Sequence, residues 1–429
     1  MTDRAADRRK NGMHDRRRSR GGMSVLVTVL LAVVFALAAG ELFARRDTKI
    51  VFWHAMGFHV KEIIEDMAAE YSSEHPGVTI DPVFQGLPDE MQVKMVAAAI
   101  SRQLPDMAQV QFEYLSSFTE NGVIDPIDDE LPEEDRRDIP RKLWDLATRD
   151  GRIYAVPFSV STTVLFYNED AFRRAGLDPE DPPSTWEDLI RYGRKLTADT
   201  DGDGRIDQYA AMFWLNGIYG IAPFLWAHGG ELFENGRVNL TSDAMINTIQ
   251  MLRDLVFEHE IMPRTWTDWE GGQAFLTGKL AMGAFTSAAI TYGMRNLPWR
   301  LRVAPMPEIN GRRYTVIGGS GLVNFARNRR TRREVNDFIL WLTGRENTTR
   351  LHEGVGYVPV RQSALQSLSL RAFHRENPNF RVPIDSLEFG RTVTYHPEFY
   401  RINEELRKML ERIILDQSDP LTELRRTER

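Results

Sequence analysis

The strongest constraint on the fold is an alternation of strand and helix patterns that begins directly after Thr48. The run KIVFWHAM predicts a buried strand, and segment 61–74 then repeats its apolar residues at helical spacing. A strand within 75–84, a helix over 90–100 and a strand within 107–112 follow through short links. Units of this kind pair their strands in parallel through right-handed crossovers and cover the sheet with helices. The sequence therefore predicts an α/β fold.

The length of 429 residues predicts two domains, because one compact core rarely extends over so long a chain. Further helices are predicted over 186–196, 244–258, 336–342 and 403–415, the first of them capped by Ser184 or Thr185. The glycines of YTVIGGSGLVNFA (Tyr314–Ala326) are expected to interrupt a strand. No repeat of 20–50 residues is visible, which argues against solenoids and propellers.

The N-terminus has the pattern of a targeting segment. Eight Arg and Lys against three Asp give residues 1–23 a net charge of +5, so the remaining chain, from a total of −7, carries −12. A basic tail before the uncharged run Ser24–Gly40 is typical of a secretory signal peptide, and a membrane anchor is the alternative. We predict that residues 24–44 are a cleaved signal or a retained transmembrane anchor, and that the protein is periplasmic or otherwise extracytoplasmic. The acidic remainder argues against nucleic acid as a partner.

Sequence motifs give no support to catalysis. The chain has no cysteine, which excludes disulfides, thiolate metal sites and cysteine nucleophiles. It contains no G-x-S-x-G elbow, no H-E-x-x-H pair and no P-loop. A glycosidase needs two facing carboxylates, which a linear sequence does not reveal, so a secreted glycosidase stays open as an alternative. We expect no enzyme activity and no required cofactor.

One acidic loop, DTDGDGRID, has the ligand spacing of a calcium site. Asp199, Asp201 and Asp203 alternate, Arg205 offers a carbonyl, and Asp207 stands at the ninth position. The twelfth position, which supplies a bidentate Glu in such loops, is an alanine. Two interpretations stay open, namely a structural Ca²⁺ site of reduced affinity and a solvent-exposed turn.

Hydroxyl residues crowd the start of an apolar strand pattern near the middle of the chain. Ser159, Ser161, Thr162 and Thr163 stand directly before the run VLFYN. Each hydroxyl removed from water needs a hydrogen-bond partner. These side chains therefore face either solvent or something that binds later.

Several stretches resemble the family 1 extracellular solute-binding proteins of ABC importers. They occur in one order as PFSVS, LFYNEDAFRRAGLDPEDPPSTWEDL, GKLAM and GYVPV, and the resemblance covers residues 48 to about 415. FWHAM, VIGGSGL, HEGVGYVPV and RENPNF are most similar to the glycerol-3-phosphate-binding branch of that family. A binder of di- or oligosaccharides is the more general alternative.

The resemblance implies a two-lobed α/β fold of the class II periplasmic-binding-protein type, with a helix-covered sheet in each lobe, several hinge crossovers and a ligand cleft between the lobes. The implied division is residues 48–158 plus about 287–345 for lobe I, about 159–286 plus about 346–415 for lobe II, and 416–429 for a charged tail. The crowded hydroxyls would then lie at the first crossover and face the cleft. Hinge closure around a small solute is the motion that such folds use.

The resemblance also implies a ligand site. Its members are Glu113, Ser161, Trp214, Thr286 or the neighbouring Ser287, Gly319, Tyr357 and Arg391. Arg391 would bind a phosphate through charge-assisted hydrogen bonds, and Glu113 would accept hydrogen bonds from ligand hydroxyls. Trp214 and Tyr357 would wall the pocket. The alternative role of Arg391 is a surface salt bridge.

One segment departs from the glycerol-3-phosphate branch, which carries an aromatic residue shortly after the second strand. This chain has GLPDEM there, and neither Leu87, Pro88 nor Asp89 replaces a tyrosine. Asp89 would also disfavour a nearby phosphate. We predict a monomeric substrate-binding subunit that delivers glycerol 3-phosphate or a glycerophosphodiester to ABC permease subunits, with a di- or oligosaccharide as the alternative ligand.

Overall fold

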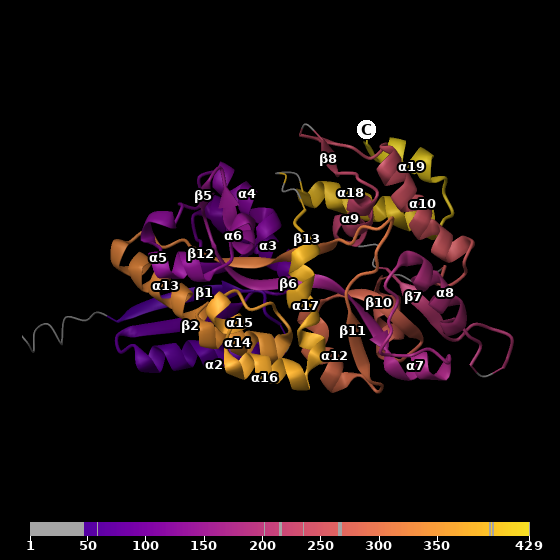
Figure 1. Cartoon of the computed structure of the whole chain (residues 1–429). Coiled ribbons are helices and arrows are strands. Elements are labelled where there is room, and N and C mark those ends of the chain that lie inside the picture. Colours follow the sequence, from indigo (N-terminus) through magenta and orange to yellow (C-terminus); the bar gives the residue numbers. More distant parts are fainter. Residues whose placement is uncertain are drawn as a thin grey trace, which may run out of the picture.

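The computed structural model describes residues 47–57, 59–200, 202–213, 217–234, 236–264, 268–393, 396 and 399–428. Two lobes lie side by side and are joined by the long central strands β6 (Val156–Asn168) and β12 (Thr315–Asn324) (Figure 1). The two-lobed α/β fold predicted from the sequence is therefore confirmed. The predicted basic tail 1–23 and the predicted signal or anchor 24–44 lie outside the described residues. None of the helices within the described ranges combines the length and apolar content that a membrane crossing needs.

Lobe I is built on the predicted strand and helix alternation. Its elements are β1 (Thr48–His54), α2 (His59–Glu74), β2 (Val78–Phe84), α3 (Pro88–Ser101), β3 (Met107–Gln111), α4 (Phe112–Glu120), α5 (Glu133–Asp138), α6 (Arg141–Ala147), α13 (Arg329–Leu342) and α14 (Arg345–Val355). Strand β1 pairs in parallel with β2 and with β3. Helix α2 packs its apolar face on this sheet because Ile64, Met67 and Tyr71 recur at helical spacing and are buried.

Lobe II carries the remaining large elements. They are α7 (Glu169–Arg174), α8 (Trp186–Leu196), β7 (Tyr209–Met212), α9 (Ile218–Ala227), α10 (Asp243–Phe257), α11 (Asp268–Leu276), β10 (Leu280–Thr286), α12 (Ile290–Asn296), β11 (Leu301–Ala304), β13 (Gly390–Arg391), α18 (Phe399–Ile414) and α19 (Pro420–Glu428). Thr185 caps α8 by accepting a hydrogen bond from the Asp188 amide at 3.1 Å, as one of the two predicted caps. The predicted charged tail contains α19, whose Leu424 is fully buried in the lobe II core.

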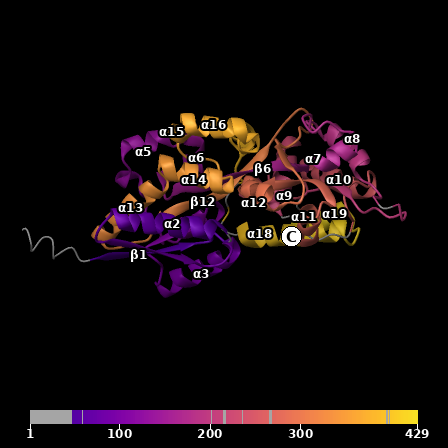
Figure 2. The same ribbon diagram turned by 90° about the horizontal axis from the view of Figure 1, so that it is seen from below.

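One continuous sheet runs through both lobes in the order β2-β1-β3-β12-β6-β10-β7. The first half of β6 pairs antiparallel with β12, and its second half pairs with β10 and β11. Figures 1 and 2 both place α3, α18 and α19 on one side of the molecule, and α15 (Gln362–Leu365) and α16 (Leu368–Glu376) on the opposite side.

The hydrophobic cores divide the chain at the crossing strands. On β6, Val160 packs in the lobe I core and Val164 in the lobe II core; on β12, Ile317 and Val316 divide in the same way. The crowded hydroxyls of residues 161–163 therefore lie where the chain passes between the two cores. A third passage follows Val360, the last fully buried residue of the lobe I core, although Ile384 and Leu387 still pack against that core.

The cores depart from the predicted domain boundaries in two segments. Residues 290–309, assigned to lobe I from the sequence, contribute to the lobe II core because β11 pairs with the second half of β6. Residues 351–360, assigned to lobe II, contribute to the lobe I core. The reason is that α14 lies against α2, where the His59 Nε2 atom is 3.2 Å from the Gly354 carbonyl oxygen.

The glycines in β12 do not interrupt the strand as expected. The strand is continuous, with a register shift between Ser320 and Gly321. Gly319 has a φ of 123°, and a Cβ there would lie 2.0 Å from the Ser159 carbonyl oxygen. Glycine is required at this position because any side chain would meet the backbone of β6.

Candidate ligand-binding site

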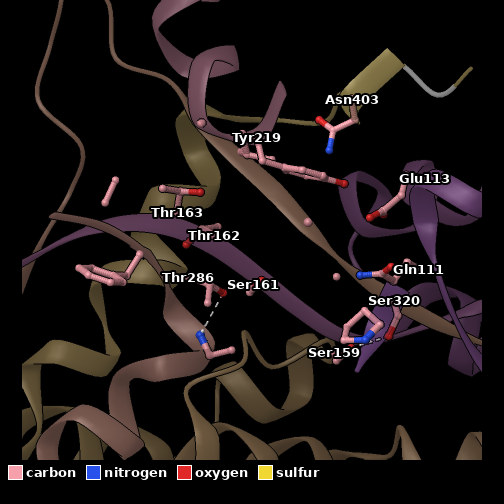
Figure 3. A pocket seen from close by; sticks show the side chains of 18 of the residues that line it. Gln111, Glu113, Ser159, Ser161, Thr162, Thr163, Tyr219, Thr286, Ser320 and Asn403 are labelled. Carbon is pink, nitrogen blue, oxygen red and sulfur yellow. Dashed lines mark hydrogen bonds between the residues drawn. The ribbon is translucent and has the colours of Figure 1, made fainter. Parts of the chain in front are cut away.

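A cavity of about 650 Å³ lies where the lobes meet, and both lobes and both crossing strands line it (Figure 3). Lobe I contributes Leu87, Pro88, Asp89, Gln109, Gln111, Glu113, Tyr114 and Tyr357. The crossing strands contribute Ser159, Ser161, Thr162, Thr163, Val316, Gly318, Gly319 and Ser320. Lobe II contributes Tyr219, Gly220, Pro223, Phe224, Ala284, Phe285, Thr286, Met306, Phe399 and Asn403, and Ala288 lies between the lobes. The volume suits a small molecule.

The lobe I wall is held by a buried polar network around Gln109. Its Nε2 donates to the Ser320 Oγ at 2.8 Å and to the Ser159 Oγ at 3.3 Å, and its Oε1 accepts from the Ala55 amide. The two serine oxygens are 2.5 Å apart. These contacts satisfy the polar groups and fix the crossing strands against β3.

Gln111 lies two residues further along β3, and its side-chain amide has fewer hydrogen bonds than that of Gln109. Its Oε1 is buried and has no hydrogen-bond partner within the described part of the chain. Because an unpaired buried acceptor is costly, a ligand hydroxyl that donates to this side chain would relieve a penalty as well as form a bond.

Glu113 presents a buried carboxyl group to the cavity from the first turn of α4. The residue is only 7% exposed, and burial raises its pKa to about 7. Hydrogen bonds from its own backbone and from the Tyr219 hydroxyl, and the charge of Arg149, partly oppose this rise, whereas the charge of Asp89 adds to it. Figure 3 shows the Tyr219 side chain extending from α9 toward Glu113, so this contact joins the two lobes.

The hydroxyls at the first crossover divide into structural and available groups. Thr162 is buried, and its Oγ1 donates to the Pro383 carbonyl at 3.3 Å. Ser159 belongs to the network around Gln109. Ser161 lines the cavity, and within the described residues its hydroxyl has no hydrogen-bond partner. Ser161 is therefore available to a ligand.

The structure brings five of the predicted ligand residues together in the cavity lining: Glu113, Ser161, Thr286, Gly319 and Tyr357. Burial raises the pKa of Tyr357 to about 12, and its hydroxyl lies 3.5 Å from the Met56 sulfur. Ser287 is fully buried behind the lining, where its Oγ accepts from the Thr162 amide at 3.3 Å. Trp214 lies outside the described residues.

Arg391 stands one strand away from the cavity wall. It is the register partner of Val316, which lines the cavity. Its guanidinium pairs with Glu231 at 2.5 Å and lies over the rings of Trp226 at 4.8 Å and Tyr314 at 5.5 Å. In this arrangement the side chain is engaged within lobe II.

Sequence reasoning missed several lining residues, above all Gln109, Gln111, Tyr219, Phe285 and Asn403. The two glutamines did leave a signal, because they alternate at the carboxyl end of a parallel strand, where ligands bind in open α/β sheets. Asn403 gave none. Its Oδ1 accepts from the Ile218 amide at 2.8 Å, and Figure 3 shows its amide nitrogen directed toward the cavity.

The charged groups of the lining are all acidic. Asp89 and Glu113 contribute carboxyl groups, and no Lys, Arg or His occurs among the lining residues of the described ranges. A ligand that enters here therefore meets hydroxyl, amide and carboxyl groups but no cationic side chain in the present arrangement.

The acidic loop proposed as a calcium site forms a tight turn. Asp199 accepts hydrogen bonds from the amides of Gly202 and Gly204 at 2.6 and 2.7 Å, and Asp207 accepts from Thr200. The Arg205 amide donates to Asp203 at 2.8 Å, and Asp201 lies outside the described residues. No group of three or more potential ligand residues gathers within the described ranges. Calcium binding stays a prediction.

Comparison with known proteins places the chain among binding proteins. A family model described as bacterial extracellular solute-binding protein matches residues 66–379. The sn-glycerol-3-phosphate-binding periplasmic protein UgpB of Shigella dysenteriae is 26% identical over 358 residues, which cover 78% of this chain and 79% of that protein.

Two solved structures extend the comparison. The crystal structure of UgpB from Mycobacterium tuberculosis in complex with glycerophosphocholine has a TM-score of 0.79 and 25% identity, and covers 89% of this chain and 96% of that one. The maltose/maltodextrin-binding domain MalE from Bdellovibrio bacteriovorus, bound to maltotriose, has a TM-score of 0.76 and 20% identity, and covers 89% and 98%. The latter likeness concerns the fold alone.

Proposed function

Because this chain belongs to the bacterial extracellular solute-binding proteins, whose members serve ABC importers, we propose that it captures a glycerophosphodiester and delivers it to a membrane permease. Its relatives include a periplasmic protein named for binding sn-glycerol 3-phosphate and a protein whose structure was solved with glycerophosphocholine. We infer that this chain is a non-catalytic, extracytoplasmic binding subunit of a transporter and acts as a monomer.

The observation that carries the proposal is the cavity between the lobes. Hydrogen-bonding groups reach it from lobe I through Gln111 and Glu113, from the crossing strand through Ser161, and from lobe II through Thr286 and Asn403. A small ligand with several hydroxyls can use donors and acceptors on both sides at once. Binding of this kind stabilises the closed arrangement of the lobes. The size of this effect is set by how much more tightly the ligand binds the closed arrangement than the open one.

The charges favour a phosphodiester over glycerol 3-phosphate. A phosphomonoester carries about −1.5 to −2 charges at neutral pH, and it would meet the carboxylate of Asp89. A diester carries a single negative charge, which the hydroxyls of Ser161 and Thr286 and the amide of Gly319 can neutralise in part. The solved relative from Mycobacterium tuberculosis contains glycerophosphocholine, a diester.

A di- or oligosaccharide is the second candidate, because the described lining holds no cationic side chain and offers the aromatic rings of Tyr219 and Phe285. Glycoside hydrolysis is less well supported. Asp89 and Glu113 both belong to lobe I, whereas a glycosidase places its two carboxyl groups on either side of the scissile bond.

Thermal-shift screening followed by isothermal titration calorimetry tests the proposal. Glycerophosphocholine is expected to raise the melting temperature and to bind with a stoichiometry of one, with glycerol 3-phosphate weaker. Maltose serves as the sugar probe and an aryl glycoside as the turnover probe. Binding of maltose alone would move the assignment to the second candidate, and release of the aryl alcohol would contradict a non-catalytic role.

Arg391 gives a sharper test of phosphate recognition. If closure brings its guanidinium to the ligand, Arg391→Ala should weaken glycerophosphocholine binding by about 2–5 kcal/mol and leave maltose binding unchanged. Arg381→Ala, which removes another partly exposed Arg paired with a carboxylate, is the matched control. Unchanged affinity for glycerophosphocholine in Arg391→Ala would remove this residue from the ligand site.

A further inference from the structure

We propose that Asp89 selects ligands by their charge at the lobe I end of the cavity. A ligand with a cationic group is accepted there, and a dianionic phosphate is rejected. This inference rests on the proposed function and deepens it. The ligand class that it names is a glycerophosphodiester whose head group bears a quaternary or primary ammonium.

The position of Asp89 follows from the start of α3. The residue stands next to Pro88 at the beginning of the helix and lines the cavity together with Leu87. Its Oδ1 lies 3.4 Å from the Tyr114 hydroxyl, which comes from α4. Glu113 precedes Tyr114 on that helix, and the charge of Asp89 is one of the causes that raise the pKa of Glu113. The two carboxyl groups therefore act on the same part of the cavity.

Asp89 is not needed to cap its helix. The N-cap position is Leu87, and its amide donates to the Glu90 Oε2 at 3.2 Å. The hydrogen bond described for the Asp89 carboxylate is the one to the Tyr114 hydroxyl, not one to a backbone amide of α3. A carboxylate at a helix N-terminus is favourable in general, but here the capping group is Glu90.

Arg149, the cation in the described part of the chain that acts on this region, does not take the place of a ligand cation. Arg149 is the basic residue whose charge acts on Glu113, but its guanidinium donates to the Phe112 and Leu146 carbonyls and to the Ser116 Oγ, and it does not line the cavity. An ammonium group at the lobe I end would meet the Asp89 carboxylate and, beside it, the ring of Tyr114.

The experiment compares three ligands of different charge by calorimetry, and the change in their affinities from the wild type to Asp89→Asn isolates the effect of the carboxylate. Glycerophosphocholine carries a cation, glycerophosphoglycerol is a diester without one, and glycerol 3-phosphate is a dianion. The wild type is expected to bind glycerophosphocholine at least tenfold more tightly than glycerophosphoglycerol. In Asp89→Asn this ratio should fall to about two, and the affinity for glycerol 3-phosphate should rise at least fivefold.

Two controls test whether an effect of Asp89→Asn comes from the charge at this position. One removes a carboxylate elsewhere, and the other checks that the variant folds. Glu134→Gln removes an exposed carboxylate from α5, outside the cavity lining, and should leave all three affinities within twofold. Melting temperatures and far-ultraviolet circular dichroism check that Asp89→Asn folds like the wild type. A preference for glycerophosphocholine that survives in Asp89→Asn would overturn the inference while leaving the proposed function intact.

A sugar arm keeps the inference testable if no glycerophosphodiester binds, which is the outcome that defeats the proposed ligand. The disaccharide of glucosamine carries ammonium groups, and cellobiose is its neutral counterpart. The charged sugar should bind at least fivefold more tightly to the wild type, and this advantage should be lost in Asp89→Asn. An equal affinity for both sugars in the wild type would contradict the role of Asp89.

Discussion

The two faces of the cavity differ in chemistry although one continuous sheet runs through both lobes. The lobe I face carries amide and carboxyl groups from Gln109, Gln111 and Glu113, whereas the lobe II face is dominated by the rings of Phe224 and Phe285 and other apolar side chains. For a ligand bound between the faces, we expect lobe I to select by hydrogen bonding and charge. Lobe II would cover the ligand with apolar surface and exclude water, which would strengthen the polar contacts on the other side.

The difference arises from how each sheet meets the cavity. Lobe I presents the carboxyl end of β3, which pairs in parallel with β1 and carries Gln109 and Gln111 into the cavity wall. Lobe II presents the end of β10 and the helix α9, which is apolar along most of its length and buried. The polar contributions of lobe II are therefore single groups such as Thr286, Tyr219 and Asn403.

The largest effect is expected where the crossing strands hold the two faces together. Gly319→Ala would place a Cβ 2.0 Å from the Ser159 carbonyl oxygen at a φ of 123°. The strain and the overlap together should lower the free energy of unfolding by about 4 kcal/mol, measured by urea denaturation. The neighbouring Gly318→Ala is the control, because its Cβ would meet Tyr219 at an ordinary 3.7 Å and its φ is not in the left-handed region. Equal stability of the two variants would contradict a tight contact between β6 and β12.

A somewhat smaller effect is expected from the buried carboxyl group of lobe I. Burial raises the pKa of Glu113 from 4.5 to about 7, so between these values the folded state holds a proton that the unfolded state has lost. Stability that depends on Glu113 is therefore fully present below pH 4.5 and falls as the pH rises to about 7, by about 3 kcal/mol at most.

Glu113→Gln removes the titration and keeps the shape of the side chain. The difference in unfolding free energy between the wild type and this variant should decrease as the pH rises from 4.5 to 7 and stay constant above. A difference that does not change with pH would show that the Glu113 carboxyl group is not buried as described.

The smallest effect concerns the contact that links the two faces directly. Tyr219→Phe keeps the ring on the lobe II side and removes the hydroxyl that bonds to Glu113. Ligand binding measured by calorimetry should weaken by about 1 kcal/mol, the usual net value of one hydrogen bond. Tyr292→Phe, on an exposed side chain outside the lining, is the control and should have no effect. A loss equal to that of the control would mean that the lobes do not cooperate through this pair.

Much of this architecture could be predicted from the sequence, because apolar periodicity specifies elements such as α2 and α8 locally. The crowded hydroxyls also marked the crossing strand correctly as a place where polar groups meet the cavity. The lobe boundaries were harder, since residues 290–309 join lobe II only through the pairing of β11 with β6, a contact between distant segments. Asn403 and Tyr219 reach the cavity by packing of α18 and α9, which no local pattern reveals.

Hydrogen–deuterium exchange tests the central claim that a ligand is held between the two faces. The protein is compared alone and with saturating glycerophosphocholine or maltose, whichever gives the larger thermal shift. The account predicts slower exchange in both α4 of lobe I and α9 of lobe II when the ligand is present. Protection confined to one lobe, or to a surface away from the β6 and β12 strands, would contradict it.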